Sequence, residues 1–424
     1  MSSGLRLAVA SLLALTLAGG AYAADDDDAL RHARELLAST ILVDGHNDLP
    51  WVIREWTEAP MDVERYDLRR PAPHETDLAR LRAGGVGAQF WSVYVPGEIE
   101  TGFARTQLEQ IDIARRMIAR YPEALEIALT ADDVDRARAN GRIASLLGME
   151  GGHVIENSLG ALRAFYELGA RYMTLTHNVT LDWVDAALDE ARHGGLTPFG
   201  REVVREMNRL GMLVDLSHVS PAVMKDVLEV SEAPVVFSHS CARAIVDHPR
   251  NVPDDVLARL ASNGGVVMVT FIPAFVSQQV KDWWDPLEAL TAGKPIDAEY
   301  QRMQREYVEQ HGPAPRATLA QVADHVERVR KVAGVDHVGI AGDFWGAGDD
   351  VTEGLEDVSK YPHLFAELIR RGWSDDDLRK LAGENVLRAL RRAEGVSHRL
   401  RQQRPPSTAT IEALDAKTAA AADD

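Results

Sequence analysis

Residues 213–239 read LVDLSHVSPAVMKDVLEVSEAPVVFSH, and this stretch is the clearest guide to the fold. An apolar run, Leu213–Ser217, is followed by Ser220-Pro221, a typical helix start because serine caps the helix and proline suits its first turn. A second apolar run, Val235–Ser238, follows the helix. Continuous apolar runs are typical of parallel strands that are buried on both faces. The stretch therefore predicts a strand–helix–strand unit of a parallel sheet.

Six further apolar runs extend the same alternation along the chain. Eight strand–helix alternations favour a (β/α)8 barrel of the TIM type, with an open doubly wound sheet as the alternative. The six other predicted strands are Ile41–Asp44, Gly87–Val93, Ile143–Met149, Tyr172–Thr176, Val266–Phe271 and Val338–Gly342.

The first 23 residues have the pattern of a secretory signal peptide. Arg6 precedes a short apolar run, Leu7–Leu17, and Ala21-Tyr22-Ala23 resembles a cleavage site. The alternative is a membrane anchor, although the run is short for a bilayer. We therefore expect an exported protein, periplasmic or secreted after cleavage near Ala23, without a stable membrane anchor.

Residues 24–397 are predicted to form the barrel, and two segments interrupt or follow it. A long insertion at about 273–315 separates the seventh and eighth strands. It is either a lid over the barrel mouth or a surface excursion. Residues 398–424 are polar and rich in alanine, so we expect a flexible tail there.

The composition excludes several classes of protein and site. The 424 residues are 46% apolar and 26% charged, as in a globular protein with a sizeable core. The formal net charge of −19 disfavours nucleic acid and anionic membranes as partners. A single cysteine, Cys241, excludes an intrachain disulfide and a cysteine-based zinc cluster. The 14 histidines leave imidazole as a candidate metal ligand.

Four histidines and three carboxylates follow predicted strands at their C-terminal ends. In (β/α)8 barrels, the active site lies at this end of the strands. Chance would scatter such residues over both ends of the barrel and the outer helices. The residues at this rim are His46, Asp48, Glu150, His177, His218, His239 and Asp343.

These side chains predict metal-assisted hydrolysis. His46 and Asp48 leave a strand end on the same side and can reach one ion, while His218 and His239 from adjacent strands can hold a second. Glu150 is placed to bridge the two. Imidazole and carboxylate ligands without thiolate suit zinc, with manganese, cobalt or iron as alternatives. Two ions roughly 3.5–4 Å apart can share a water and make hydroxide available as the nucleophile.

An ordered set of motifs over roughly residues 39–392 resembles the zinc dipeptidase family whose best-known member is membrane (renal) dipeptidase. Each motif is weak alone, but the ordered set is specific. The motifs are Val43–Pro50 (VDGHNDLP), Glu150–His153 (EGGH), Thr174–Asn178 (TLTHN), Asp215–Ser220 (DLSHVS), Phe237–Ser240 (FSHS), Arg250–Asp255 (RNVPDD), Gly342–Phe344 (GDF), Gly354–Ser359 (GLEDVS) and Gly383–Val386 (GENV).

The resemblance implies a (β/α)8 barrel that hydrolyses dipeptides with two zinc ions per chain and forms a homodimer. By position, His46 and Asp48 bind one zinc and His218 and His239 the other. Glu150 and a water or hydroxide bridge the two ions. The lipid anchor and disulfides of mammalian members are absent, as in soluble exported bacterial members.

The resemblance also implies roles for three residues around the metals. His177 binds the substrate and stabilises the developing oxyanion. Asp343 takes the proton of the attacking water and passes it to the leaving amine. Arg250 anchors the C-terminal carboxylate of the dipeptide through its guanidinium fork. Trp345 stands where an acidic or small residue is more familiar, and Ile272–Phe275 lacks an expected tyrosine, so the preferred dipeptide stays open.

Two other functions are weighed against the dipeptidase. Related amidohydrolase-type barrels, such as deacetylases or lactonases, place His-x-His on the first strand and bridge the metals with a modified lysine. Here the first strand ends in His46-Asn47-Asp48 and the predicted bridge is Glu150. The other alternative is an exported protein that binds metal or peptide without turnover. Asp343, a free carboxylate beside the ligand set, disfavours it.

Overall fold

The computed structural model describes residues 28–99, 101–291, 298–348 and 350–422. The predicted signal peptide lies outside the described residues, so it stays a prediction. None of the helices within the described residues has the length and apolar composition needed to cross a membrane.

Eight parallel strands close into a barrel. Their order around the ring is β1-β2-β4-β5-β6-β7-β8-β9, and β9 pairs with β1. The predicted (β/α)8 barrel is therefore confirmed and the open sheet is wrong. Each strand overlaps one of the eight predicted runs: β1 (Leu42–Asn47), β2 (Val86–Ser92), β4 (Ile143–Glu150), β5 (Ala170–Thr174), β6 (Leu213–Asp215), β7 (Val236–Phe237), β8 (Val266–Thr270) and β9 (Val338–Ala341).

Successive residues of a strand enter two separate apolar clusters. Leu42 packs in the cluster that includes the surrounding helices, whereas Val43 packs with Phe90, Tyr172 and Met268 from other strands. Because neighbouring side chains of a strand point to opposite faces, both faces of the barrel wall are buried. This explains why the runs are continuously apolar.

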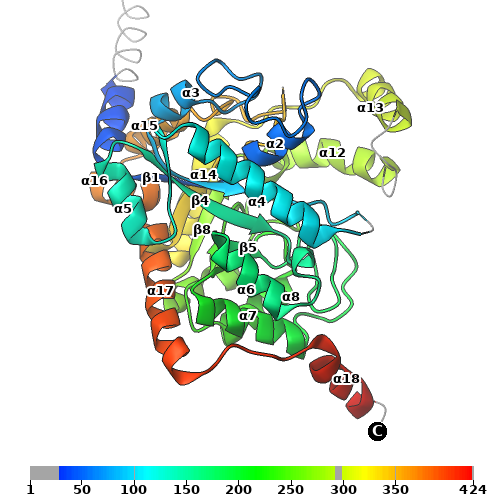
Figure 1. Ribbon diagram of the computed structural model, residues 1–424. Helices are drawn as coiled ribbons and strands as arrows, with labels where there is room; N and C mark the ends of the chain where they lie inside the picture. The colour runs from blue at the N-terminus through cyan, green and yellow to red at the C-terminus, as the bar shows by residue number, and fades with distance from the viewer. Residues whose placement is uncertain (1–27, 100, 292–297, 349, 423–424) are drawn as a thin grey trace, which may run out of the picture.

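Helices surround the strands, as Figure 1 shows for α4, α14 and α17. Helix α8 begins as predicted, because the Ser220 hydroxyl accepts a hydrogen bond from Val223 N. The helices outside the insertion and the tail are α2 (Leu49–Glu55), α3 (Leu78–Ala83), α4 (Phe103–Arg120), α5 (Ala131–Ala139), α6 (Leu159–Glu167), α7 (Pro198–Leu210), α8 (Pro221–Val230), α9 (Asp254–Leu257), α10 (Leu260–Asn263), α14 (Leu319–Ala333), α15 (Tyr361–Arg370), α16 (Asp375–Arg379) and α17 (Asn385–Gln403).

A short ninth strand, β3 (Leu125–Ile127), lies outside the ring. It pairs with the start of β4, where Leu125 faces Ile143, while the later residues of β4 pair with β5. Three residues between two helices carry too little pattern to predict a strand.

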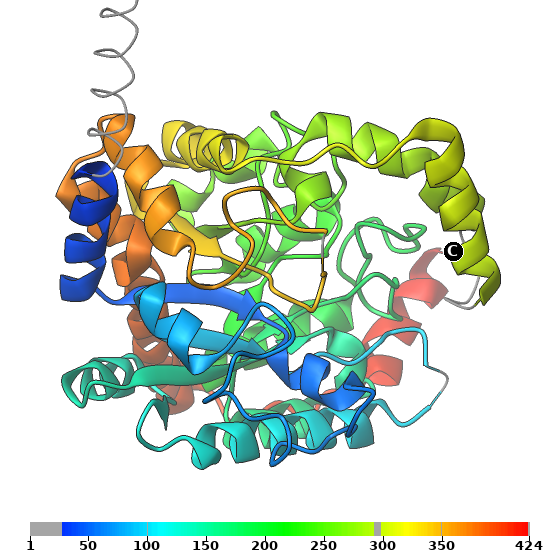
Figure 2. The ribbon, with the colours of Figure 1, turned by 90° about the horizontal axis from the view of Figure 1, so that it is seen from above.

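The insertion and the C-terminal segment are largely helical. Within the insertion lie α11 (Pro273–Val276), α12 (Gln278–Thr291) and α13 (Ala298–His311), and α13 is at the periphery in both views (Figures 1 and 2). In the predicted flexible tail, α17 continues to Gln403, and α18 (Ile411–Ala422) follows. The Asp415 carboxylate accepts a hydrogen bond from Phe199 N, which ties α18 to the start of α7. The described part of the tail is therefore a helical arm packed on α7.

Candidate metal centre

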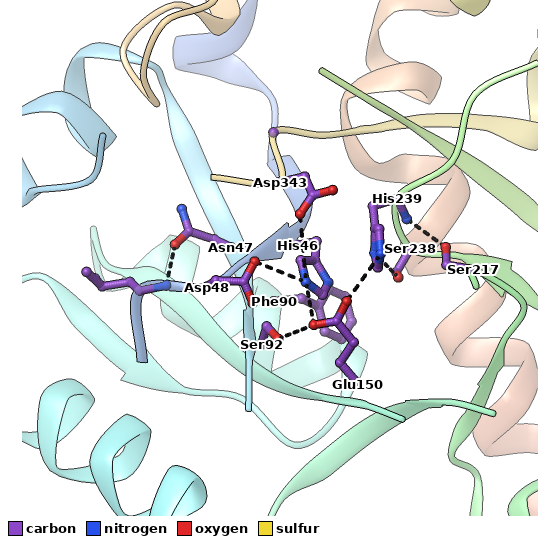
Figure 3. Close-up of polar contacts among 12 residues, drawn as sticks. His46, Asn47, Asp48, Phe90, Ser92, Glu150, Ser217, Ser238, His239 and Asp343 are labelled. Carbon is purple, nitrogen blue, oxygen red and sulfur yellow. Dashed lines mark hydrogen bonds and ion pairs between the residues drawn. The ribbon is translucent and has the colours of Figure 1, made fainter. Parts of the chain in front are cut away.

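Side chains from several strand ends meet at the C-terminal end of the barrel (Figure 3). His46 and Asp48 leave β1, and Glu150 is the last residue of β4. His218 and His239 follow β6 and β7. The predicted convergence of these five residues is therefore present in the structure.

The first group of candidate ligands lies around the His46 ring. Its Nε2 atom is 3.4 Å from Asp48 Oδ2, 3.3 Å from Glu150 Oε2 and 4.0 Å from Asp343 Oδ1. Figure 3 shows Glu150 and Asp343 on opposite sides of this ring. His46, Asp48 and Asp343 offer atoms close enough together to surround one ion.

The second group faces the other oxygen of the same glutamate. Glu150 Oε1 is 3.1 Å from His218 Nε2 and 3.4 Å from His239 Nε2. His177 Nε2 is 4.0 Å from the same oxygen. The two carboxylate oxygens of Glu150 thus face two different histidine groups, which is the arrangement that a bridging ligand requires.

Each candidate imidazole is oriented by a contact of its Nδ1 atom. An acceptor at Nδ1 favours the ring tautomer with a proton on Nδ1, and this leaves the Nε2 lone pair directed at the site. The contacts are His46 Nδ1 with Tyr172 Oη at 2.8 Å, His218 Nδ1 with Asn178 Oδ1 at 3.1 Å and His239 Nδ1 with Ser238 Oγ at 2.8 Å.

The ligand atoms fit a divalent cation. Burial holds the pKa of both His218 and His239 well below the usual range, so both rings are neutral at neutral pH. Their Nε2 atoms are only 2.9 Å apart, and two lone pairs at this distance repel unless a cation lies near them. His46 Nε2 and Asp48 Oδ1 are buried and have no hydrogen-bond partner among the described residues. This set of nitrogen and oxygen donors suits zinc.

Asp215 supports His239 through a serine, and it is not among the site residues predicted from the sequence. The Asp215 carboxylate accepts hydrogen bonds from the hydroxyls of Ser238 and Thr174, each at 2.5 Å, and from the backbone N–H groups of Ser217 and Ser238. The Ser238 hydroxyl is therefore held in place to accept from His239 Nδ1. The sequence contains one indication of this role, because Asp215 is a carboxylate inside an otherwise apolar run. A carboxylate buried in this way needs hydrogen-bond partners.

Asp44 has the same position in β1 and links it to β9. Its carboxylate accepts hydrogen bonds from Gly342 N at 2.9 Å, His46 N at 3.3 Å and the Tyr361 hydroxyl at 2.6 Å. Asp44 thereby fixes the backbone on either side of the site, next to His46 and Asp343.

Two residues of the site have a left-handed backbone. His218 has φ = 69° and Asp343 has φ = 58°. Residues other than glycine adopt this conformation at a cost of about 1–3 kcal/mol, and such residues cluster at functional sites. No sequence pattern predicted a left-handed backbone at these two positions.

Asp343 is buried beside the first group of ligands. Its Oδ2 atom accepts a hydrogen bond from Thr270 Oγ1 at 3.3 Å, and its Oδ1 atom faces His46. Burial raises the pKa of Asp343 to about 7, and the nearby carboxylates of Asp48 and Glu150 act in the same direction. A carboxyl group with such a pKa can both take up and release a proton near neutral pH.

Arg250 is buried in the same cavity, and its guanidinium donates no hydrogen bond to the described residues. The side chain is 1% exposed, and none of its three guanidinium nitrogens has a hydrogen-bond partner among the described residues. Burial lowers the pKa of Arg250 to about 10, so it is still charged at neutral pH. Its guanidinium carbon is 5.0 Å from the centre of the Phe275 ring. A buried charge of this kind calls for an anionic ligand.

His177 lies between two other rings at the site. Its ring centre is 4.4 Å from that of His218 and 4.8 Å from that of Tyr94. Burial, followed by the charge of Arg250, holds the pKa of His177 well below its usual range. The ring is therefore neutral and can donate one N–H to a ligand.

All eight predicted site residues belong to this one place in the fold. A cavity of about 460 Å³ is lined by seven of them, and the fully buried His46 contacts four of the seven. Apolar and aromatic side chains complete the wall: Trp51, Tyr94, Ile272, Phe275 and Trp345.

The chain is similar to known proteins over most of its length. Residues 30–404 match the family model described as membrane dipeptidase (peptidase family M19). Dipeptidase verJ from Clonostachys rogersoniana is 42% identical over 388 residues, which cover 89% of this chain and 90% of that protein.

Two solved structures share the fold. The probable dipeptidase PvdM from Pseudomonas aeruginosa is 26% identical with a TM-score of 0.75, covering 87% of this chain and 99% of that one. A metallo peptidase from Rhodobacter sphaeroides, liganded with a phosphinate mimic of the dipeptide L-Ala-D-Ala, is 25% identical with a TM-score of 0.69, covering 84% of this chain and 99% of that one.

Proposed function

This chain belongs to the membrane dipeptidase family, peptidase family M19, and on that basis we propose that it hydrolyses dipeptides with the help of two zinc ions. The observation that carries this proposal is the unpaired, buried Arg250 in the cavity that holds the candidate ligands. A free dipeptide has both groups that such a site would bind. Its C-terminal carboxylate can pair with the guanidinium, and its peptide carbonyl can reach the metals. The cavity volume of about 460 Å³ suits a ligand of this size.

The metal ions would be held by the two groups of side chains described above. His46 and Asp48 would hold one ion and His218 and His239 the other, with Glu150 between them. Ser92 Oγ donates a hydrogen bond to Glu150 Oε2 at 3.1 Å and orients this carboxylate. When bound, such ions lower the pKa of a water molecule and polarise a carbonyl oxygen.

Three further residues would complete the reaction. Arg250 binds the C-terminal carboxylate of the dipeptide and so fixes the scissile bond. The carboxylate of Asp343 takes a proton from the attacking water and gives it to the leaving amine, as its pKa near neutrality permits. His177, as a neutral ring, donates its N–H to the carbonyl oxygen as negative charge develops there.

The first experiment removes and restores the metal. Protein stripped with EDTA should hydrolyse no dipeptide, and zinc should restore hydrolysis of a panel that includes L-Ala-L-Ala and L-Ala-D-Ala. Elemental analysis should find two zinc ions per active chain. If the zinc-loaded protein hydrolyses no dipeptide of the panel, the proposed function is wrong.

The second experiment tests the role of Arg250. Arg250→Ala should chiefly raise KM for dipeptides with a free C-terminal carboxylate, by about 10- to 100-fold for the loss of a charge-assisted pair. Dipeptide amides lack this carboxylate, so their hydrolysis should change much less. An equal effect on free and amidated dipeptides would contradict the assignment. Arg243→Ala, at an arginine paired with Asp247 outside the cavity, is the matched control.

A further inference from the structure

We propose that Trp345 makes the site selective for dipeptides whose N-terminal residue has a bulky apolar side chain. This inference rests on the proposed dipeptidase function, because it assigns one end of the substrate to Arg250. It concerns the side chain of the N-terminal residue of the dipeptide, which takes no part in the proposed metal chemistry and can differ from one substrate to the next.

Trp345 presents a large apolar surface at the cavity. The side chain lines the cavity and is 48% exposed, although tryptophan is highly buried on average. Leaving so much apolar surface in water forgoes the free energy that burial would provide. A substrate side chain that covers the indole ring would recover it.

The loop that carries Trp345 is held on both sides of the ring. On one side, Phe344 O accepts a hydrogen bond from Asp48 N at 3.0 Å. On the other side, Gly346 N and Gly348 N donate to the two carboxylate oxygens of Glu75, at 3.1 and 3.2 Å. Glu75 is itself buried. The position of the tryptophan at the cavity is therefore set by the backbone before any ligand arrives.

The order of strands in the ring places Arg250 and two aromatic side chains on opposite sides of the barrel mouth. Arg250 follows β7, and the strand opposite β7 in the eight-strand ring is β2. Tyr94 follows β2 and Trp51 follows β1, and their rings meet edge to face at 5.0 Å. Trp345 follows β9, which lies two strands from β7 and two strands from β2, so the contacts of its loop decide the side of the cavity on which it lies.

A dipeptide anchored at Arg250 by its C-terminal carboxylate therefore extends its N-terminal residue towards Tyr94 and Trp51. Segment 344–346 lies beside the start of α2, because a Cβ atom on Gly346 would lie 3.3 Å from Val52. Together with the hydrogen bond from Asp48 N to Phe344 O, this proximity points to the Asp48 side of the cavity for Trp345, the side on which Trp51 also lines it. Phe275, by contrast, packs on the guanidinium of Arg250 and faces the C-terminal end of the substrate.

The test compares kcat/KM for two pairs of dipeptides with zinc-loaded protein. Phe-Ala and Gly-Ala differ at the N-terminal residue, whereas Ala-Phe and Ala-Gly differ at the C-terminal one. The parent protein should prefer Phe-Ala over Gly-Ala by about tenfold or more, which corresponds to partial burial of an aromatic ring. Trp345→Ala should reduce this preference about tenfold and change the ratio of Ala-Phe to Ala-Gly by less than about threefold.

Two further variants separate selectivity from damage to the fold. Trp345→Phe keeps an apolar ring and should retain most of the preference for Phe-Ala. Leu290→Ala, at an exposed apolar residue of α12 outside the cavity lining, should leave both ratios as in the parent protein. Thermal unfolding of each variant checks that the barrel is intact.

The outcomes distinguish this inference from the function on which it rests. If no dipeptide is hydrolysed by the parent protein, both proposals are wrong. If dipeptides are hydrolysed but Trp345→Ala leaves the ratio of Phe-Ala to Gly-Ala unchanged, only the selectivity is wrong. A loss confined to the ratio of Ala-Phe to Ala-Gly would overturn the assignment of Trp345 to the N-terminal side.

Discussion

His239 is the candidate ligand whose orientation depends on a buried charge. The tyrosine at His46 and the amide at His218 are neutral partners, whereas Ser238 donates its own proton to the Asp215 carboxylate. A hydroxyl that donates to a carboxylate is a better acceptor for the Nδ1 proton, since hydrogen bonds in a chain polarise one another. We therefore expect the Nε2 atom of His239 to be a stronger donor to a metal than an unsupported imidazole.

Removal of the Ser238 hydroxyl tests this support. Ser238→Ala leaves His239 Nδ1 without its acceptor and should weaken zinc binding about 10- to 100-fold. Competition with a chromophoric chelator measures the affinity. Ser240→Ala is the control, because Ser240 is buried nearby and contacts Ser217 rather than the His239 ring. An equal loss of affinity in both variants would contradict the role of Ser238.

Replacement of Asp343 by asparagine separates proton transfer from metal binding. Asparagine accepts a left-handed backbone, so Asp343→Asn should fold, yet it cannot take up a proton. We expect kcat for Ala-Ala to fall about 100-fold or more while zinc content stays at the parent level.

Steady-state kinetics and elemental analysis on the same preparation give both numbers for Asp343→Asn. Asp247→Asn, at an exposed carboxylate, is the control and should behave as the parent protein. Unchanged kcat in Asp343→Asn would refute the proton-transfer role.

For individual residues, a position at the end of a predicted strand was the feature of the sequence that predicted the site. It identified His218 and His239, which would be unremarkable histidines elsewhere in the chain. Arg250 has no such position, and only the resemblance of its motif to a known family pointed to it. Asp215 was missed because its contacts join residues from three strands, and a linear pattern does not show which hydroxyls the fold brings to it.

The loop of residues 343–348 is the element on which the site depends most. It follows β9, carries Asp343 and Trp345, and is fixed by Glu75 from a loop 270 residues earlier in the chain. Two glycines with positive φ, Gly346 and Gly348, allow both N–H groups to face one carboxylate.

Removal of the Glu75 carboxylate should loosen this loop. In Glu75→Ala the N–H groups of Gly346 and Gly348 lose their acceptors, so their hydrogen exchange should accelerate about tenfold or more. Exchange measured by mass spectrometry on a peptide covering 343–351 tests this, with peptides from α4 as the internal control. Unaltered exchange in the loop would mean that Glu75 does not hold it.

The eight strands of the ring were predictable because burial on both faces makes a strand continuously apolar. This apolar pattern can be recognised in the sequence without knowing which strands lie next to each other in the ring. The three residues of β3 are too few to show it. What the sequence could not supply was the placement of Phe275 against Arg250, which depends on how α11 packs.

For the whole molecule, metal binding should contribute to stability. The candidate ligands come from four strand ends around the ring, so an ion that binds them binds the folded state alone. Occupancy at 100 times the dissociation constant would stabilise that state by about 2.7 kcal/mol. Zinc added to stripped protein should therefore raise Tm by several degrees, as measured by calorimetry.

The control for this thermal shift is Glu150→Ala. This variant lacks the carboxylate that faces both histidine groups and should lose most of the zinc-dependent part of the shift. An equal shift in the variant would show that zinc stabilises the protein from somewhere else.

Closure of the ring through β1 and β9 also bears on when the proposed metal site forms. His46 comes early in the chain, but β1 is held on one side by β9, whose residues follow almost 300 positions later. Until that last strand docks, the ring is open between β1 and β8. The proposed metal site is therefore complete only in the closed ring, and we expect metal capture to follow the docking of β9.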